Sequence, residues 1–293
     1  YQGGGIYAEG SNSTIKSCTI SNNHSPNLGG GLLIYVSPME IINTEISQNS
    51  ASYGGGICIA QMPSPTLTNV LITNNTALNY GGGLLATASA APSIINSTIA
   101  NNSSILNGGG LRIEGGNTTV LNSILFYNSP QEISYVSEPG IQSSISLSHS
   151  NIEGGLENIE TDDNGTVNWL PGNINSDPRF VNPNSSLYNL ADISPALGAG
   201  LDTSIVPLTD LEGNLRPNPA GSNPDIGAYE SPLAEPIVVV EVQNLHIGGS
   251  EGTLHLISHN PLISYSYYNS LEEPLGFHQI QVSSLSDFSL IDK

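Results

Sequence analysis

Hydrophobic residues recur along the first half of the chain with a period of about 26 residues. One aliphatic column consists of Ile15, Ile41, Leu67, Ile94 and Val120, and a second of Ile20, Ile46, Ile72, Ile99 and Leu125. The segments around them are short, rich in Ile, Val, Leu and Thr, and bounded by Gly, Pro or Asn, which predicts strands and turns. A coil of this length does not close a core alone. Successive coils must therefore stack, with strands paired at about 4.8 Å.

Glycine triplets mark the same period. They begin at Gly3, Gly29, Gly54, Gly81 and Gly108, which are 26, 25, 27 and 27 residues apart, and each is followed by Ile or Leu. A fixed period of this kind indicates an internal repeat. Glycine suits a bend between strands, which needs positive φ or close backbone approach. A phosphate-binding loop is the alternative, but no Gly-Lys-Ser/Thr follows any triplet.

Two polar columns accompany the aliphatic ones. The first consists of Ser17, Asn43, Asn69, Asn96 and Asn122, and the second of Asn23, Asn49, Asn75, Asn102 and Asn128. Stacked Asn amides hydrogen-bond from coil to coil and satisfy turn groups that are costly to bury unpaired. We therefore expect both columns to form ladders, with Asn49, Asn75 and Asn102 in mutual hydrogen-bond reach.

The pattern predicts an all-β chain with a right-handed parallel β-helix over residues 1–231. A linker at 232–236 follows, and the composition then changes. Residues 237–293 predict strands at 238–242, 253–257, 263–267 and 278–282, typical of a short and incomplete β-sandwich-like module of the immunoglobulin or fibronectin kind.

The net charge of the chain limits the classes of partner that it is expected to bind. The chain has 25 acidic and 5 basic side chains, a formal charge of −20, although only 10% of its residues are charged. Without Lys or Arg clusters it has no means of binding nucleic acid or anionic membranes, and no run of 18 apolar residues predicts a membrane span. Cys18 and Cys58 occupy different places in the repeat, so we expect no stacked disulfide.

The sequence "NSTIANNSSILNGGGLRI" and its sister coils resemble the repeats of bacterial surface β-helix proteins in the pectate-lyase-like superfamily, which includes the polymorphic membrane protein passengers. Downstream, "HSNIEGGLENIE", "GNINSDPRFVN", "LYNLADISPALGAG" and "DLEGNLRPNPAGSNPDIGAYE" resemble the closing coils of secreted bacterial β-helix proteins whose helix commonly ends at D-I-G-A-Y-E. The resemblance covers about 1–230. It implies the fold and an extracellular or cell-surface location, and it leaves the function open.

Enzymatic chemistry finds little support in the sequence. The resemblance to pectate lyases implies β-elimination, which needs clustered acids that hold Ca²⁺ and a base. Arg112 is the sole candidate base in the coils, and its alternative role is a surface Arg opposite Glu114. A hydrolase needs two carboxylates flanking a sugar bond, but adjacent Asp162 and Asp163 face opposite ways on a strand and more readily shape a turn. We predict no enzymatic activity and no catalytic residue.

No metal site is predicted. His255 and His259 are too far apart along a strand to share one ion. Calcium at the acidic turns "TDDNG" or "LTDLEGN" is the one cofactor that the sequence leaves open.

Two functions remain. The first is a structural or assembly protein, a rod or filament subunit at the cell surface, whose uncapped first coil and incomplete last module favour head-to-tail self-association. The second is an adhesin or carbohydrate-binding protein that meets a glycan with a face of the helix. Tyr7, Tyr35, Tyr53, Tyr80 and Tyr127 lie in the coils. They do not share one repeat position, and the missing aromatic stripe favours the structural hypothesis.

Overall fold

The computed structural model describes residues 3–136, 140–247, 250–259, 262–269, 281–284 and 287–289. The chain forms two compact units, Tyr1–Pro236 and Ile237–Lys293, and each is described by itself. The division lies at the end of the segment 232–236. Among the described residues, no helix is long and apolar enough to cross a membrane.

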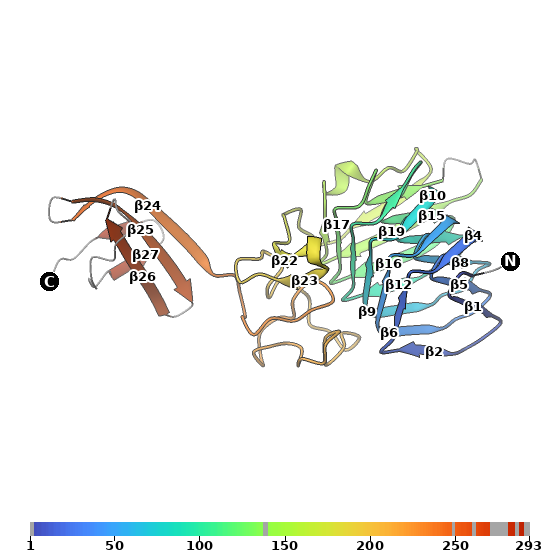
Figure 1. The fold of residues 1–293 in the computed structure, drawn as a ribbon, viewed down its shortest axis with the longest axis horizontal. Coiled ribbons are helices and arrows are strands. Elements are labelled where there is room, and N and C mark those ends of the chain that lie inside the picture. Colours follow the sequence, from blue (N-terminus) through green and yellow to red (C-terminus); the bar gives the residue numbers. More distant parts are fainter. Residues whose placement is uncertain are drawn as a thin grey trace. The chain divides into compact units, whose positions relative to one another are not determined.

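The first unit is a right-handed parallel β-helix, as the repeat predicts (Figure 1). The coils contribute strands to three parallel sheets. The first sheet contains β1 (Ile6–Glu9), β5 (Leu32–Tyr35), β8 (Ile57–Ala60), β11 (Leu84–Thr87), β15 (Leu111–Glu114) and β18 (Ile133–Tyr135). The shortest sheet contains β4 (His24–Leu28), β7 (Ser50–Tyr53), β10 (Thr76–Tyr80) and β14 (Ser103–Ser104).

The longest sheet has eleven strands and bends in the middle of each coil. It contains β2 (Thr14–Lys16), β3 (Thr19–Ser21), β6 (Glu40–Ser47), β9 (Thr66–Thr73), β12 (Ser93–Ile95), β13 (Thr98–Ala100), β16 (Gly116–Leu121), β17 (Ile124–Phe126), β19 (Ser143–Ser148), β20 (Asn151–Ile152) and β21 (Gly165–Trp169). The bend falls on the first polar column, whose members all have left-handed backbone with φ between 44° and 53°. Asn tolerates this conformation better than most residues, which explains why Asn dominates the column.

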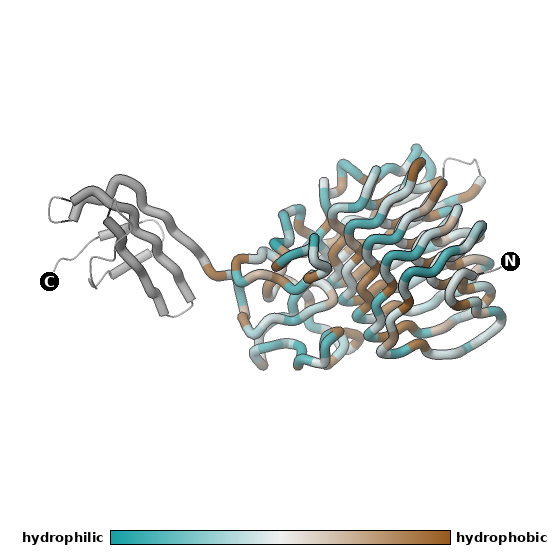
Figure 2. Tube along the Cα trace, in the orientation of Figure 1, coloured by the Kyte–Doolittle hydropathy of each residue, from teal (hydrophilic) through white to brown (hydrophobic). Residues whose placement is uncertain are grey.

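Both aliphatic columns face the inside of the coils and form one core. Strand pairing keeps Ile41 beside Leu67 and Ile46 beside Ile72, in register. Figure 2 shows hydrophobic positions lining up from coil to coil. A one-residue slip would turn these side chains outward, so the 26-residue pattern also fixes the register.

The glycine triplets are required by close packing. The first residue of four triplets has positive φ, for example 60° at Gly29. At the second position, a Cβ on Gly30 would lie 2.3 Å from the carbonyl oxygen of Gly55 in the next coil. Side chains are therefore excluded there by backbone atoms, which have no room to move.

A hydroxyl ladder that the sequence analysis missed runs beside the bend. Ser97 and Ser123 are buried, and each accepts a hydrogen bond from the backbone N–H one coil earlier, Val70 N to Ser97 Oγ at 3.0 Å and Ser97 N to Ser123 Oγ at 3.1 Å. Ser123 N donates to Ser150 Oγ in the same way at 3.1 Å. The signal is present in the sequence, because each of these serines directly follows the left-handed position of its coil.

The predicted extent of the helix is wrong. Parallel pairing ends with β21 and a single parallel bridge from Asn151 to Ile174, not at residue 231, and residues 175–236, here called the tail, are mostly turns. The tail contains one antiparallel pair, β22 (Phe180–Asn182) with β23 (Leu187–Leu190), joined by the 3-10 turn η2 (Pro183–Ser185). It packs on the outer surface of the longest sheet, where tail and sheet side chains form a second apolar cluster: Leu71, Ala100, Ile124, Phe126, Phe180, Tyr188, Ala196 and Ile226. The other 3-10 turn is η1 (Leu156–Asn158).

The second unit is antiparallel where it is described. β24 (Val238–Ile247), β25 (Ser250–His259) and β26 (Leu262–Asn269) form one sheet, and β27 (Gln281–Ser284) pairs with β28 (Asp287–Ser289). The first three predicted strands lie within these elements. Residues 278–280 of the fourth lie outside the described residues.

Candidate functional site

The second polar column forms a continuous hydrogen-bonded stack, here called the Asn ladder. In each coil the Asn Nδ2 donates to the Oδ1 of the Asn one coil later, at 3.0 Å from Asn49 to Asn75 and 2.9 Å from Asn75 to Asn102. The same Oδ1 also accepts the backbone N–H of the preceding Asn. Nδ2 also reaches back to a core carbonyl, as from Asn75 to the oxygen of Ile46 at 2.8 Å. The predicted contact among Asn49, Asn75 and Asn102 is therefore present.

The ladder ends on a carboxyl group. Glu132 occupies the place of the next Asn, and its two oxygens accept the backbone N–H of Asn128 at 2.8 Å and the Nδ2 of Asn128 at 2.5 Å. Glu132 is buried and lines a pocket of about 340 Å³ together with Glu153. Burial raises the pKa of Glu132 well above its usual range, and nearby Glu153 raises it further. Because Asn128 holds both oxygens, the arrangement serves to terminate the ladder.

Glu132 gives a pH-dependent prediction. Its folded-state pKa is raised, so its contribution to stability is fully present below its unfolded pKa of about 4.3 and is lost as pH rises through the folded value. The variant Glu132→Gln keeps an acceptor oxygen without a charge. Its NH2 group then faces one of the two Asn128 donors, so the variant is expected to be less stable than the wild type at about pH 4, and this deficit is expected to shrink toward about pH 8, as measured by urea midpoints across that range. Parallel profiles for the two proteins would contradict this role.

The first polar column behaves differently from the prediction. Asn69 Nδ2 does bond Asn43 Oδ1 at 2.9 Å, but the column does not form a continuous amide ladder. Its last three side chains bind the tail instead: Asn69 Nδ2 donates to the carbonyl oxygen of Thr209 at 2.7 Å, Asn96 Nδ2 to that of Asp225 at 3.3 Å, and Asn122 exchanges two bonds with the backbone of Leu201. The left-handed backbone directs these amides to the surface that the tail covers.

A buried charged cluster holds the end of the tail together. Arg216 Nε lies 3.3 Å from Glu230 Oε2, close enough for an ion pair although not in hydrogen-bond direction, and both side chains are fully buried. Asp225 accepts the backbone N–H groups of Gly198 and Ser231, each at 2.7 Å. Burial raises the pKa of Asp225 to about 7 and also raises the pKa of Glu230. The D-I-G-A-Y-E motif therefore contributes Asp225 and Glu230 to a buried cluster with Arg216, here called the clasp, which stabilises the end of the tail.

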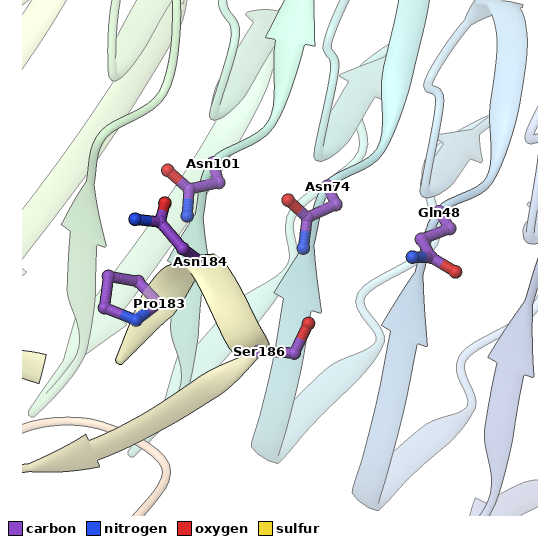
Figure 3. A pocket seen from close by; sticks show the side chains of 6 residues that line it. All are labelled: Gln48, Asn74, Asn101, Pro183, Asn184 and Ser186. Atoms are coloured by element: carbon purple, nitrogen blue, oxygen red, sulfur yellow. The ribbon is translucent and has the colours of Figure 1, made fainter. Parts of the chain in front are cut away.

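A polar cleft lies where the tail meets the coils. Its volume is about 430 Å³, within the range of ligand pockets, and it is lined by Gln48, Asn74, Asn101, Pro183, Asn184 and Ser186. Figure 3 shows the three coil residues side by side on successive coils, with the η2 turn beside them. None of the six lining side chains carries a charge. The cleft offers amide donors and acceptors and one hydroxyl group.

The coil side of this cleft is fixed by a repeated backbone conformation. Gln48, Asn74 and Asn101 directly follow β6, β9 and β13 and have φ of 56°, 56° and 54°. Buried Tyr188 accepts hydrogen bonds at its Oη from Asn101 Nδ2 at 2.8 Å and Asn74 Nδ2 at 3.4 Å. Each amide keeps a second donor hydrogen and its acceptor oxygen for a ligand.

Tyr127 continues the same position one coil further on. Its backbone is also left-handed, its ring packs edge-on against Phe126 at 5.0 Å and Phe180 at 6.4 Å, and its Oη donates to Asp177 Oδ1 at 3.0 Å. Partial burial and the bond to Asp177 raise the pKa of Tyr127 to about 12, so the phenol stays protonated at neutral pH. The ring is held in place and 38% exposed.

Two interpretations of single residues are wrong. Arg112 is not a surface residue: it is 3% exposed, although its Nε does lie 3.5 Å from Glu114. Its guanidinium lies 4.8 Å from the ring centroid of Tyr80. Tyr53 and Tyr80 do share a repeat position, directly before a glycine triplet, with rings 6.0 Å apart. Leu28 and Tyr53, from the segments before two of the triplets, pack against the outer face of the first sheet, where Leu33, Cys58 and Leu85 form a small apolar layer.

The two acidic turns have structural roles. Asp162 and Asp163 lie in an exposed turn with left-handed backbone, as predicted. Asp210 of "LTDLEGN" is buried, and its oxygens accept the backbone N–H groups of Glu212, Asn214 and Glu230. In the described part of the chain, no three His, Cys, Asp or Glu side chains are placed to hold a metal ion. The side chains of His255 and His259 lie outside that part.

Cys18 is exposed and Cys58 buried, and both are free thiols.

Comparison with known proteins agrees with the architecture. The family model of the right handed beta helix region matches residues 1–168. No curated protein and no solved structure matched the chain. Because the matched segment spans more than half of the 293 residues, the chain belongs to the right handed beta helix region family.

Proposed function

We propose that this chain is a non-catalytic, extracellular glycan-binding protein that holds an uncharged carbohydrate in the cleft between its coils and its tail. The single observation that carries this proposal is the chemistry of the cleft lining. Three amides from successive coils face a fourth amide and a hydroxyl group from the tail, with no charged group among them. Sugar hydroxyl groups pair well with amides, which donate and accept at once.

The charge of the chain supports an uncharged ligand. A formal charge of −20 would repel polyuronates and sulfated glycans over long range, and no Arg or Lys lines the cleft to offset that repulsion. Neutral hexose or pentose chains experience no such penalty. We therefore favour carbohydrate binding over a purely structural role. Head-to-tail association of copies stays a separate prediction, which light scattering at high concentration tests.

Side-chain deletion in the cleft tests the proposal. The variant Gln48→Gly/Asn74→Gly removes two amides at positions where glycine adopts the same positive φ without strain. Two lost hydrogen bonds of about 1 kcal/mol each are expected to weaken binding by roughly tenfold or more. The measurement is fluorescence titration with the neutral oligosaccharides that an array of neutral and acidic glycans identifies.

The matched control is Gln61→Gly, which makes the same change at an exposed residue with φ of 71° away from the cleft. It is expected to bind as the wild type does. Equal affinity of the double variant and the wild type, or a preference of the wild type for acidic glycans, would refute the assignment of the cleft.

A further inference from the structure

One outer row of side chains extends the cleft along the stack of coils. It consists of the residues that directly follow the second half of each bent strand: Asn22, Gln48, Asn74, Asn101 and Tyr127. Their φ values lie between 54° and 63°, so each side chain leaves its coil in the same way. The residues before them are register partners from coil to coil. Neighbours in the outer row are therefore about 4.8 Å apart.

The cleft occupies only the middle of this row. Gln48, Asn74 and Asn101 line it, while Asn22 and Tyr127 each lie one coil beyond it, at opposite ends. Asn22 is exposed, and Tyr127 is 38% exposed. The row therefore offers four amides in succession and an aromatic ring at one end. Its length exceeds that of a single sugar.

The ring of Tyr127 is immobilised on both sides. Phe126 from its own strand and Phe180 from the tail hold it edge-on, and the bond to Asp177 fixes its hydroxyl group. Phe180 begins β22, which leads directly into the η2 turn that walls the cleft. Ring and cleft are thus parts of one surface. A fixed aromatic ring binds the apolar C–H face of a sugar with little loss of side-chain entropy.

We infer that the ligand of this site is an unbranched, extended, neutral glycan that lies along the outer row, one sugar to each coil, with a terminal sugar packed on Tyr127. This inference rests on the proposed function and adds the shape and length of the ligand. An extended β-1,4-linked chain advances by about one coil spacing for each sugar. Successive sugars are turned over relative to one another, so hydroxyl groups from the two edges of the chain meet the amides alternately, and amides pair with either edge because they donate and accept. A coiled α-1,4-linked chain turns its hydroxyl groups away from the row.

The test compares two length series on the intact chain: cello-oligosaccharides and malto-oligosaccharides, each from the monosaccharide to the hexasaccharide. Affinity for the β-linked series is expected to rise with each sugar up to the tetra- or pentasaccharide and then level off. The variant Tyr127→Ala is expected to weaken binding of the longest β-linked chains about fivefold to tenfold, with the disaccharide unchanged. Tyr127→Phe keeps the ring, so it is expected to bind like the wild type.

The control is Tyr7→Ala, which removes a ring of similar exposure, 40%, from the first sheet. It is expected to leave binding unchanged, and Tyr127→Phe keeps the test informative if Tyr127→Ala does not fold. Equal affinity for disaccharide and hexasaccharide, equal affinity for both linkages, or full binding by a folded Tyr127→Ala would overturn the extended mode while leaving neutral glycan binding in place. Absence of binding in both series and to every neutral glycan of the array would overturn the proposed function as well.

Discussion

Replacing Asn75 by Leu is expected to lower the free energy of unfolding by on the order of 4 kcal/mol, although the two side chains have the same number and branching of heavy atoms. The side chain of Asn75 takes part in four hydrogen bonds in a fully buried position. The variant leaves the backbone N–H of Asn49 and the carbonyl oxygen of Ile46 without partners. Each such group costs about 1–3 kcal/mol when buried. Denaturation by urea gives the value.

The matched control for this variant is Asn27→Leu, the same chemical change at an exposed position of β4. It is expected to change stability by less than about 0.5 kcal/mol. If Asn75→Leu were as mild as Asn27→Leu, the Asn ladder would not contribute to holding the coils together.

Replacing Arg216 by Met is expected to destabilise the tail by about 3–5 kcal/mol, because it leaves buried Glu230 and Asp225 without their cation. The guanidinium also donates to the carbonyl oxygen of Gly227 at 3.1 Å, a bond that Met does not replace. Loss of the clasp loosens the tail from the outer face of the coils. Limited proteolysis within residues 200–236 is then expected to precede cleavage of the coils.

A double-mutant cycle separates the ion pair from general damage to packing. In Arg216→Met/Glu230→Gln the carboxylate that pairs with Nε of Arg216 is gone as well, so the loss of stability should be smaller than the sum of the two single losses. Strictly additive losses would show that Arg216 and Glu230 do not stabilise each other.

The repeat predicts the coils well because it acts through local geometry. A 26-residue period, the glycine triplets and the Asn ladder each follow from one coil packing on the next, and Asn75 is placed correctly by counting alone. The triplets do not mark the end of the helix, since no glycine triplet follows Gly108 although parallel strands continue to β21. The expectation that coils continue to residue 231 relied on the resemblance of the downstream segments to closing coils. The D-I-G-A-Y-E motif at the end of those segments belongs to the tail.

The cleft was hidden because its two sides are distant in sequence. The outer row does not keep one residue type from coil to coil, because Gln48 and Tyr127 stand where other coils have Asn. It is therefore not recognisable in the sequence as a repeated column. Its wall comes from the tail, and only the docking of Tyr188 brings η2 beside the coils. Arg112 was misplaced for a related reason: the pattern of its strand predicts an exposed outer face and does not reveal the segment that covers it.

The most direct test of the proposed function follows the side-chain amide signals of an isotope-labelled chain during titration with the neutral oligosaccharide that binds most tightly on the array. The account predicts that the Nδ2 and Nε2 signals of Asn74, Asn101 and Gln48 shift with increasing ligand, whereas the buried amide of Asn75 in the Asn ladder stays unchanged. Saturating shifts elsewhere on the coils, with the signals of Asn74, Asn101 and Gln48 unmoved, would contradict it.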